Sequence, residues 1–193
     1  MKWYLDLDDT LFQTTLGYSE VCRAVSKLYK IKLMTFAIRM LRMRAKPTKG
    51  GSERGYLRLF HTLRSFGIDP DEAAPVIKQE LERYDFLFPD AAVLLDWLEN
   101  QGVRPVILTF GDPETQVFKM SLVPRLAEFE HVVVQEPKQQ YLKKMTKHDA
   151  ILVDDKPIQD LPDWCRGVLI QRKIRVAPPN TRVITKLTEL IHE

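Results

Sequence analysis

Five short runs of apolar and β-branched residues recur along this 193-residue chain, and they constrain its fold more than any other feature. The runs occupy residues 2–7, 103–109, 131–135, 150–153 and 167–171. Most are apolar at successive positions, which is typical of strands buried on both faces of a parallel sheet. Helical patterns separate most of the runs, at residues 90–100, 113–122 and 137–146, and a last one at 181–191 closes the chain. This alternation predicts an α/β fold with a doubly wound parallel sheet.

Residues 13–88 interrupt the alternation, because no strand-like run stands out among them. Helical patterns occupy residues 18–44, 55–66 and 71–85, and a loop is expected at 46–51. We therefore predict an all-α cap at residues 13–88, inserted after the first strand of a Rossmann-like core. The core would consist of residues 1–12 and 89–193.

The inserted segment is basic, although the whole chain has a net charge of only +3. Between Arg23 and Arg64 there are twelve Lys or Arg residues and a single acidic residue, Glu53. This asymmetry indicates an anionic partner, and a small phosphorylated molecule is the first expectation. Nucleic acid would also fit such a surface, through its phosphates. A solvated helix face is the alternative explanation for Arg39, Arg42, Arg44, Lys46 and Lys49.

Composition favours a globular protein, with 45% hydrophobic and 28% charged residues. No run approaches the roughly 20 apolar residues that span a bilayer, so no membrane association is expected. Lys2 and Asp6 interrupt the apolar residues where a signal peptide would need them. The two cysteines, Cys22 and Cys165, have no metal-binding spacing and suggest no disulfide framework. We therefore expect a cytoplasmic location, while the oligomeric state is left open.

Polar side chains follow the predicted strands at the point where each one ends. They are Asp6, Asp8 and Asp9 after the first, Thr109 at the second, Lys138 after the third, and Asp154 and Asp155 at the fourth. Open α/β sheets bind ligands at this carboxyl edge, so we expect these groups to lie close together. Clustered carboxylates repel one another unless a cation joins them, and an all-oxygen site suits Mg²⁺. A carboxylate that faces a bound phosphate can attack phosphorus and form an aspartyl-phosphate.

These segments resemble motifs of the haloacid dehalogenase (HAD) superfamily, phosphatase branch. Asp6-Leu-Asp8-Asp9-Thr10 looks like its first motif, DxDx(T/V), and Val106-Ile-Leu-Thr109 looks like its second. The run from Ala150 to Asp155 looks like its fourth motif, an apolar strand that ends in paired acids. The resemblance covers residues 1–12 and 89–175, and the position of the insertion matches that of a C1-type cap.

The resemblance implies a role for each matched residue in phosphomonoester hydrolysis. Asp6 would be the nucleophile and a Mg²⁺ ligand. Asp8 would act first as general acid and then as the base that activates water, with its backbone carbonyl on the metal. Thr109 would hydrogen-bond the phosphoryl group. Asp154 would bind Mg²⁺, and Asp155 would support the metal directly or through water.

The third motif of the family is a single lysine, and four residues compete for it. The candidates are Lys119, Lys138, Lys143 and Lys144. Lys138 is preferred because it follows the third strand at the start of a helix, and Lys119 is second. Two departures concern the metal site: Val153 stands where many relatives have Gly, and only Asp160 or Gln159 could supply their later polar residue.

Three other functions remain open from the sequence. Haloacid dehalogenation needs the attacking aspartate but neither the metal nor the acid at Asp8. A phosphomutase would use the same core and pass the phosphoryl group to a second hydroxyl. A nucleic-acid-end phosphatase or a nucleic-acid-binding module would use the basic cap. The sequence does not specify the substrate.

Overall fold

The computed structural model describes residues 1–43, 57–172 and 182–191. By their contacts the residues form two compact units. The first consists of Met1–Gln13, Leu87–Phe110 and Phe129–Glu193. The second consists of Thr14–Phe86 and Gly111–Glu128, so residues 111–128 group with the predicted insertion. That this second unit serves as a cap stays a prediction.

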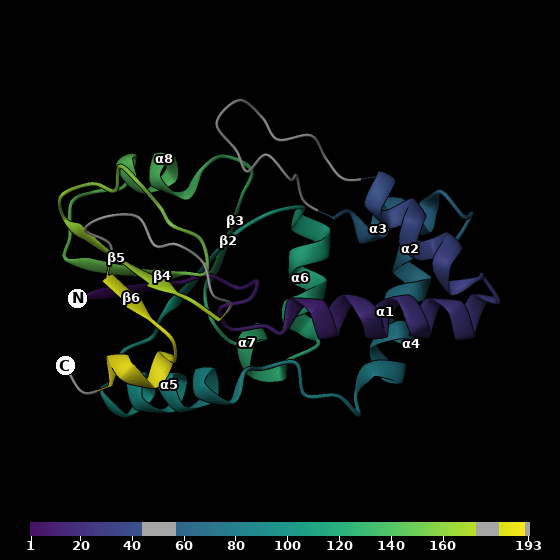
Figure 1. Ribbon diagram of the computed structural model, residues 1–193, viewed down its shortest axis with the longest axis horizontal. Helices are drawn as coiled ribbons and strands as arrows, with labels where there is room; N and C mark the ends of the chain where they lie inside the picture. Colours follow the sequence, from purple (N-terminus) through teal and green to yellow (C-terminus); the bar gives the residue numbers. More distant parts are fainter. Residues whose placement is uncertain (44–56, 173–181, 192–193) are drawn as a thin grey trace. The chain divides into compact units, whose positions relative to one another are not determined.

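A six-stranded parallel sheet forms the centre of the first unit, in the order β3-β2-β1-β4-β5-β6 (Figure 1). The strands are β1 (Lys2–Leu5), β2 (Val106–Phe110), β3 (His131–Val134), β4 (Ala150–Asp154), β5 (Cys165–Ile170) and β6 (Arg182–Ile184). Each strand pairs in parallel with its neighbours. The strand order reverses direction at β1, which confirms the predicted α/β, Rossmann-like sheet.

Helices cover both faces of this sheet. Figure 1 shows α8 (Lys138–Lys143) on one face, and α5 (Pro89–Asn100) with the 3₁₀ helix η1 (Leu187–Leu190) on the other. Successive strand side chains point to opposite faces, so Tyr4 packs into the buried cluster that contains Leu142 of α8. Its neighbour Trp3 meets Trp97 of α5 edge to face, with ring centroids 6.0 Å apart. Burial on both faces explains why these strands are apolar throughout.

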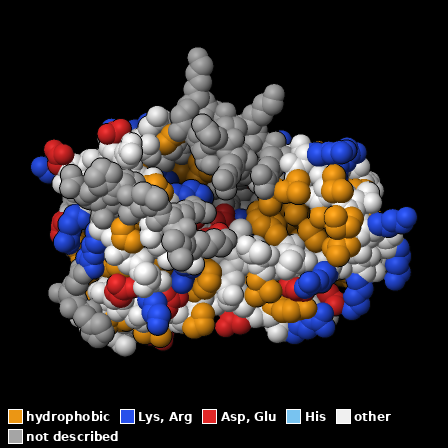
Figure 2. All heavy atoms as spheres, viewed as in Figure 1, with side chains coloured by type: hydrophobic (Ala, Val, Ile, Leu, Met, Phe, Trp, Pro, Cys, Tyr) orange, Lys and Arg blue, Asp and Glu red, His pale blue; other side chains and the backbone are white. Residues whose placement is uncertain are grey.

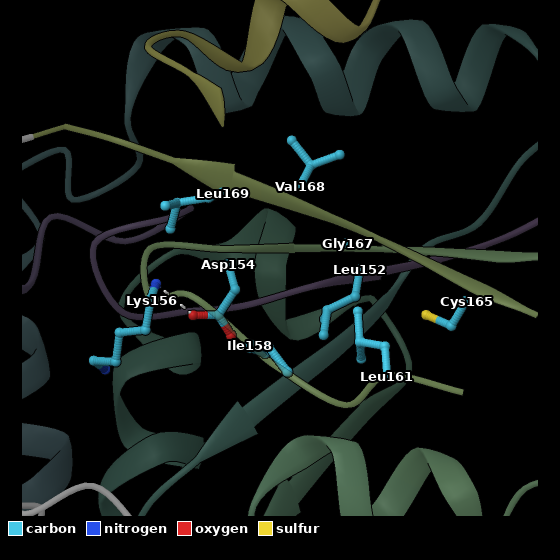
Figure 3. Close-up of a pocket in the computed structure, with 9 residues that line it drawn as sticks. All are labelled: Leu152, Asp154, Lys156, Ile158, Leu161, Cys165, Gly167, Val168 and Leu169. Carbon is cyan, nitrogen blue, oxygen red and sulfur yellow. Dashed lines mark hydrogen bonds between the residues drawn. The ribbon is translucent and has the colours of Figure 1, made fainter. Parts of the chain in front are cut away.

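The connection from β4 to β5 is an irregular loop of residues 155–164 and contains no helix. It leaves a cavity of about 220 Å³ against the sheet (Figure 3). The apolar lining includes Ile158, Leu161 and Cys165, and Asp154 and Lys156 lie at one end. A Cβ atom on Gly167 would stand 2.8 Å from Leu161 Cδ1, so glycine permits the close approach of the loop to β5.

The second unit is helical throughout its described part, as predicted. Its helices are α1 (Thr14–Tyr29), α2 (Leu33–Arg42), α3 (Leu59–Arg64), α4 (Pro70–Leu81), α6 (Pro113–Ser121) and α7 (Pro124–Ala127). The helical pattern predicted at 18–44 forms two helices, because Lys30 takes a left-handed φ of 56° between α1 and α2. The predicted loop at 46–51 lies outside the described residues.

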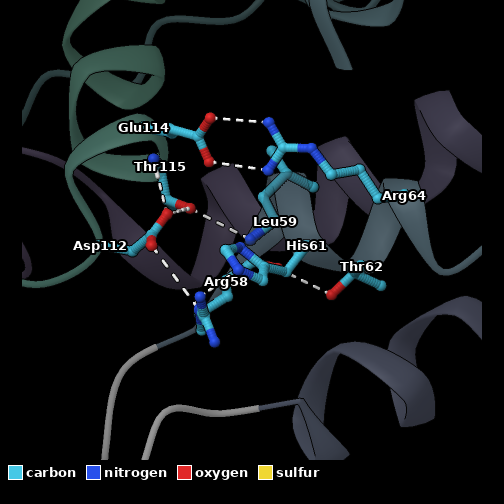
Figure 4. Close-up of polar contacts among 8 residues, drawn as sticks. All are labelled: Arg58, Leu59, His61, Thr62, Arg64, Asp112, Glu114 and Thr115. Carbon is cyan, nitrogen blue, oxygen red and sulfur yellow. Dashed lines mark hydrogen bonds and ion pairs between the residues drawn. The ribbon is translucent and has the colours of Figure 1, made fainter. Parts of the chain in front are cut away.

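Polar contacts between α3 and α6 explain why residues 111–128 belong to the helical unit (Figure 4). Asp112 caps α6, since its Oδ2 accepts hydrogen bonds from the amide and the hydroxyl of Thr115 at 3.2 and 2.8 Å. The Thr115 hydroxyl in turn accepts the amide of Leu59 at 3.1 Å. Arg64 and Glu114 add a bidentate ion pair, with N–O distances of 3.0 and 2.8 Å.

Helix α2 buries one side and exposes the other. Phe36 and Met40 are buried, whereas Met34, Ile38 and Leu41 are exposed. Figure 2 shows hydrophobic side chains gathered over the part of the molecule where Figure 1 places α2. The described helices include none with the length and apolar character needed to cross a membrane.

The helix predicted at 181–191 is wrong. Residues Arg182–Ile184 form β6, which pairs in parallel with β5 through Val168 and Ile170, and η1 follows. Val183 and Ile184 are β-branched, and the edge of β5 offers them unpaired backbone groups, so tertiary pairing overrides the helical spacing.

Candidate active site

Sheet register brings Asp6 and Asp154 side by side. Leu5 is paired with Val153, so the next residues of β1 and β4 are these two aspartates. The Asp6 amide donates to the Val153 carbonyl at 2.9 Å, which extends the pairing by one residue. Both side chains are buried, with 3% and 4% of their residue surfaces exposed. Two neighbouring carboxylates that are buried away from water repel each other, so they need a cation between them.

Lys138 supplies a cation to both carboxylates. It is the first residue of α8 and 7% exposed, and its Nζ donates hydrogen bonds to Asp6 Oδ1 and to Asp154 Oδ2. Burial by itself lowers the pKa of this lysine, but the charges of Asp154 and Asp6 outweigh burial and raise the pKa above its ordinary value. Lys138 therefore stays protonated and links the ends of β1 and β4.

A third carboxylate completes a cluster that fits a divalent cation. Oxygen atoms of Asp6, Asp154 and Asp155 lie within 4.8 Å of one another. The second oxygen of Asp6, Oδ2, is buried and has no hydrogen-bond partner among the described residues. Oδ1 of Asp155 is also buried and makes no hydrogen bond there, although Lys156 Nζ lies 3.5 Å away. Open carboxylate oxygens in an all-oxygen set are what Mg²⁺ requires.

Burial raises the pKa of two of these carboxyls in the metal-free protein. The pKa of Asp6 rises from 3.8 to about 8, because burial and the charge of Asp154 outweigh the opposing effect of Lys138. The pKa of Asp155 rises to about 6, again chiefly through burial, with Lys156 opposing the shift. A cation bound among the three acids would add positive charge beside them and so favour their ionised forms.

Asp8 and Thr109 lie at the same carboxyl edge of the sheet. Asp8 is half-buried in a tight turn that follows β1, where the amides of Leu11 and Phe12 donate to the Leu7 carbonyl at 3.1 and 2.8 Å. Thr109 is fully buried in β2, the strand next to β1. Because Leu5 is paired with Ile107, Thr109 stands level with Leu7, just beyond Asp6.

The other candidate lysines have different surroundings. Lys119 belongs to the helical unit, where its Nζ lies 4.8 Å from the centroid of the Tyr18 ring. Lys144 is exposed and pairs with Glu136 at 2.7 Å. Lys138 is therefore the candidate that contacts the two buried aspartates.

Sequence reasoning missed Lys156, which follows the acid pair directly. Its amide donates to Asp154 Oδ1 at 2.8 Å, and the side chain is 57% exposed. Burial alone would lower the pKa of Lys156, but the negative charges of Asp6, Asp155 and Asp154 have a larger, opposite effect. The pKa of Lys156 is therefore raised above its ordinary value. A lysine directly after two acids was the available signal for a second cation at this edge.

Comparison with known proteins gives one family. A family model described as haloacid dehalogenase-like hydrolase matches residues 4–162. No curated protein matches the sequence.

Solved structures resemble the whole chain at low identity. A haloacid dehalogenase-like hydrolase from Burkholderia xenovorans LB400 is 16% identical with a TM-score of 0.66, over 98% of this chain and 94% of that one. A HAD phosphatase from Thermococcus onnurineus is 19% identical with a TM-score of 0.58, over 98% and 96%. A dehalogenase solved with an intermediate complex is 15% identical with a TM-score of 0.56, over 98% and 94%. These likenesses show the fold.

Proposed function

Because the chain belongs to the haloacid dehalogenase-like hydrolases, we propose that it is a Mg²⁺-dependent phosphohydrolase that cleaves a phosphomonoester through an aspartyl-phosphate. One observation carries the proposal. Asp6 accepts a hydrogen bond from Lys138 on one oxygen, whereas the other has no hydrogen-bond partner in the described part of the chain and lies beside two further acids, Asp154 and Asp155. This is the arrangement that a carboxylate needs in order to attack an anionic phosphate next to a cation.

Asp6 is the proposed nucleophile. Lys138 fixes Oδ1, so the side chain presents Oδ2 in a single orientation, and this positioning lowers the entropic cost of attack. Burial disfavours the ionised form that attacks, and the positive charge of Lys138 counteracts that effect. The phosphorus–oxygen bond to the leaving group breaks as the bond to Asp6 forms.

Asp8 is the proposed general acid and base. It stands two residues after Asp6, in the turn rather than in the sheet, and its half-buried side chain can exchange protons with solvent. It would protonate the leaving oxygen, and then take a proton from the water that hydrolyses the aspartyl-phosphate.

Cationic and hydroxyl groups are proposed to hold the phosphoryl oxygens. Lys138 and the Thr109 hydroxyl come from adjacent parts of the same sheet edge, and Lys156 adds a second positive charge there. Mg²⁺ held by Asp6, the Asp8 carbonyl, Asp154 and Asp155 would supply further charge stabilisation for the transferring group.

Haloacid dehalogenation is the competing function, since one similar structure is a dehalogenase. That reaction displaces halide with a single carboxylate and has no need of a cation. Asp154 and Asp155 beside Asp6 would then only raise the cost of ionising the nucleophile, as their effect on its pKa indicates. The acid cluster therefore favours phosphoryl transfer.

A substrate panel tests the proposal. It contains an aryl phosphate, sugar phosphates, nucleotides, a 5′-phosphorylated oligonucleotide and a 2-haloacid, each assayed in Mg²⁺ and in EDTA. We expect phosphate release that requires Mg²⁺. Halide release in EDTA without phosphate release would contradict it. Transfer of phosphate to a second hydroxyl would identify a mutase.

A further inference from the structure

Arg172 binds the backbone of the turn that carries Asp8. It lies two residues beyond the end of β5, and its side chain is 15% exposed. Its Nε donates to the Asp9 carbonyl at 3.0 Å, and its Nη2 donates to the Thr10 carbonyl at 2.6 Å. Two consecutive carbonyls of the turn are thus held by one planar guanidinium group.

The other side of this guanidinium is anchored to the core. Nη1 and Nη2 donate to both oxygens of Asp90, in the first turn of α5, at 3.1 and 3.0 Å. Asp90 also accepts the amide of Leu187 at 2.9 Å, and the guanidinium carbon lies 3.6 Å from the centroid of the Phe88 ring. The bidentate carboxylate balances the charge, so Arg172 acts on the turn through geometry rather than through net charge.

The turn itself needs such support. Asp9 has a φ of 56°, in the left-handed region that non-glycine residues seldom adopt. Conformations of this kind persist where surrounding contacts over-determine them. The Asp9 amide donates to the Phe12 carbonyl at 3.0 Å, and Arg172 binds the Asp9 carbonyl on the other side of the same residue.

We infer that Arg172 is a positioning residue for the proposed general acid. By fixing the carbonyls of Asp9 and Thr10 it holds the left-handed turn, and the turn sets the direction of the neighbouring Asp8 side chain. The catalytic part of this inference rests on the proposed phosphohydrolase function. The part that concerns the turn does not.

The test compares Arg172→Lys with Arg64→Lys. Arg64→Lys is a matched control, because Arg64 also makes a bidentate pair with a carboxylate, Glu114, but in the helical unit. Backbone hydrogen exchange is measured in peptides that cover residues 6–13, with peptides from β2 and β4 as internal references. We expect Arg172→Lys to raise exchange in residues 6–13 at least tenfold and to leave the references unchanged.

Kinetics with an aryl and an alkyl phosphate supply the second readout. We expect Arg172→Lys to lower kcat about tenfold or more for the alkyl phosphate, whose leaving group needs the acid, and less for the aryl phosphate. KM should change less than threefold. Added guanidinium should restore part of the kcat of Arg172→Ala, a rescue that a general loss of fold would not show.

Each outcome is decisive. Unchanged exchange in residues 6–13 overturns the inference, as does faster exchange with both kcat values unchanged. If the wild-type protein releases no phosphate, the proposed function fails, and the exchange result still decides whether Arg172 holds the turn. Should Arg172→Lys not fold, Asp90→Asn replaces it, with the same expected direction in exchange.

Discussion

Asp6 and Asp154 share one lysine: Lys138 donates to an oxygen of each, from the start of α8. Three residues that are far apart in the sequence thus form a buried ionic cluster at the carboxyl edge of the sheet. The cluster joins two buried carboxyl groups to one ammonium group, and Asp155 adds a third carboxyl group. The three carboxyl groups, and the Asp6 Oδ2 that finds no hydrogen-bond partner among the described residues, make the cluster a candidate for Mg²⁺ and phosphate.

Replacing Lys138 tests the role of this lysine. We expect Lys138→Met to lower kcat/KM by about 10²–10³-fold, because a preorganised cation is lost where negative charge develops. The matched control is Lys144→Met, which removes an exposed lysine paired with Glu136 and should leave activity near that of the wild type. Steady-state kinetics check both. A loss confined to Lys119→Met would transfer the role to Lys119.

Asp8→Asn should act through the leaving group. Without the acid we expect kcat for an alkyl phosphate to fall about 10²–10⁴-fold, and kcat for p-nitrophenyl phosphate to fall less, because nitrophenolate leaves without protonation. Asp9→Asn is the control, since Asn tolerates the left-handed φ at that position. Equal losses for the two substrates would remove Asp8 from the role of acid.

Mg²⁺ binding should strengthen as the pH rises from 6 to 8. In the metal-free protein the pKa of Asp6 is about 8 and that of Asp155 about 6, both raised chiefly by burial, so protons compete with the metal. Calorimetric titration at the two pH values, in buffers of different ionisation enthalpy, measures the affinity and the protons released. Equal affinity at both pH values would contradict the assignment.

The same shifts predict how the stability of the metal-free protein depends on pH. A carboxyl whose folded pKa is raised contributes stability that is fully present below its unfolded pKa, ordinarily 3.8, and is lost as the pH rises through the folded value. Because of Asp6, the free energy of unfolding of the metal-free protein should fall as the pH rises from about 4 to about 8. The rise in Tm on adding Mg²⁺ should be larger at pH 8 than at pH 6, and Asp154→Asn should remove most of it.

The basic helix α2 is expected to attract the substrate. Arg39 and Arg42 are exposed there, and replacing both with Gln should raise KM for the true substrate about threefold or more at low salt, with kcat unchanged. Screening should abolish the difference at high salt. Arg104→Gln with Arg166→Gln removes two exposed arginines of the first unit as a control. An unchanged KM would identify the α2 arginines as a solvated face.

Much of the fold could be predicted because buried strands and their carboxyl ends both leave local patterns in the sequence. Apolar runs such as Ile107–Leu108 identify buried strands, and the acids or threonine that end the first, second and fourth runs mark the carboxyl edge. The segment at 181–191 could not be assigned in this way. Its helical spacing lost to pairing with β5, a partner that only the tertiary structure provides.

The candidate site likewise contains residues that the sequence could place and residues that only the tertiary structure places. Asp6 and Asp154 could be placed together from strand ends alone, whereas the bridging position of Lys138 depends on where α8 begins. Arg172 carried no signal, because its partners at Asp9, Thr10 and Asp90 are distant in sequence and two of them are backbone carbonyls.

Hydrolysis of p-nitrophenyl phosphate by the wild-type protein and by Asp6→Asn, each in Mg²⁺ and in EDTA, tests the central claim most directly. We expect turnover by the wild type that EDTA abolishes and added Mg²⁺ restores, and a loss of at least about 10³-fold in a folded Asp6→Asn. Turnover by Asp6→Asn near the wild-type rate, or wild-type turnover that persists in EDTA, would contradict the account.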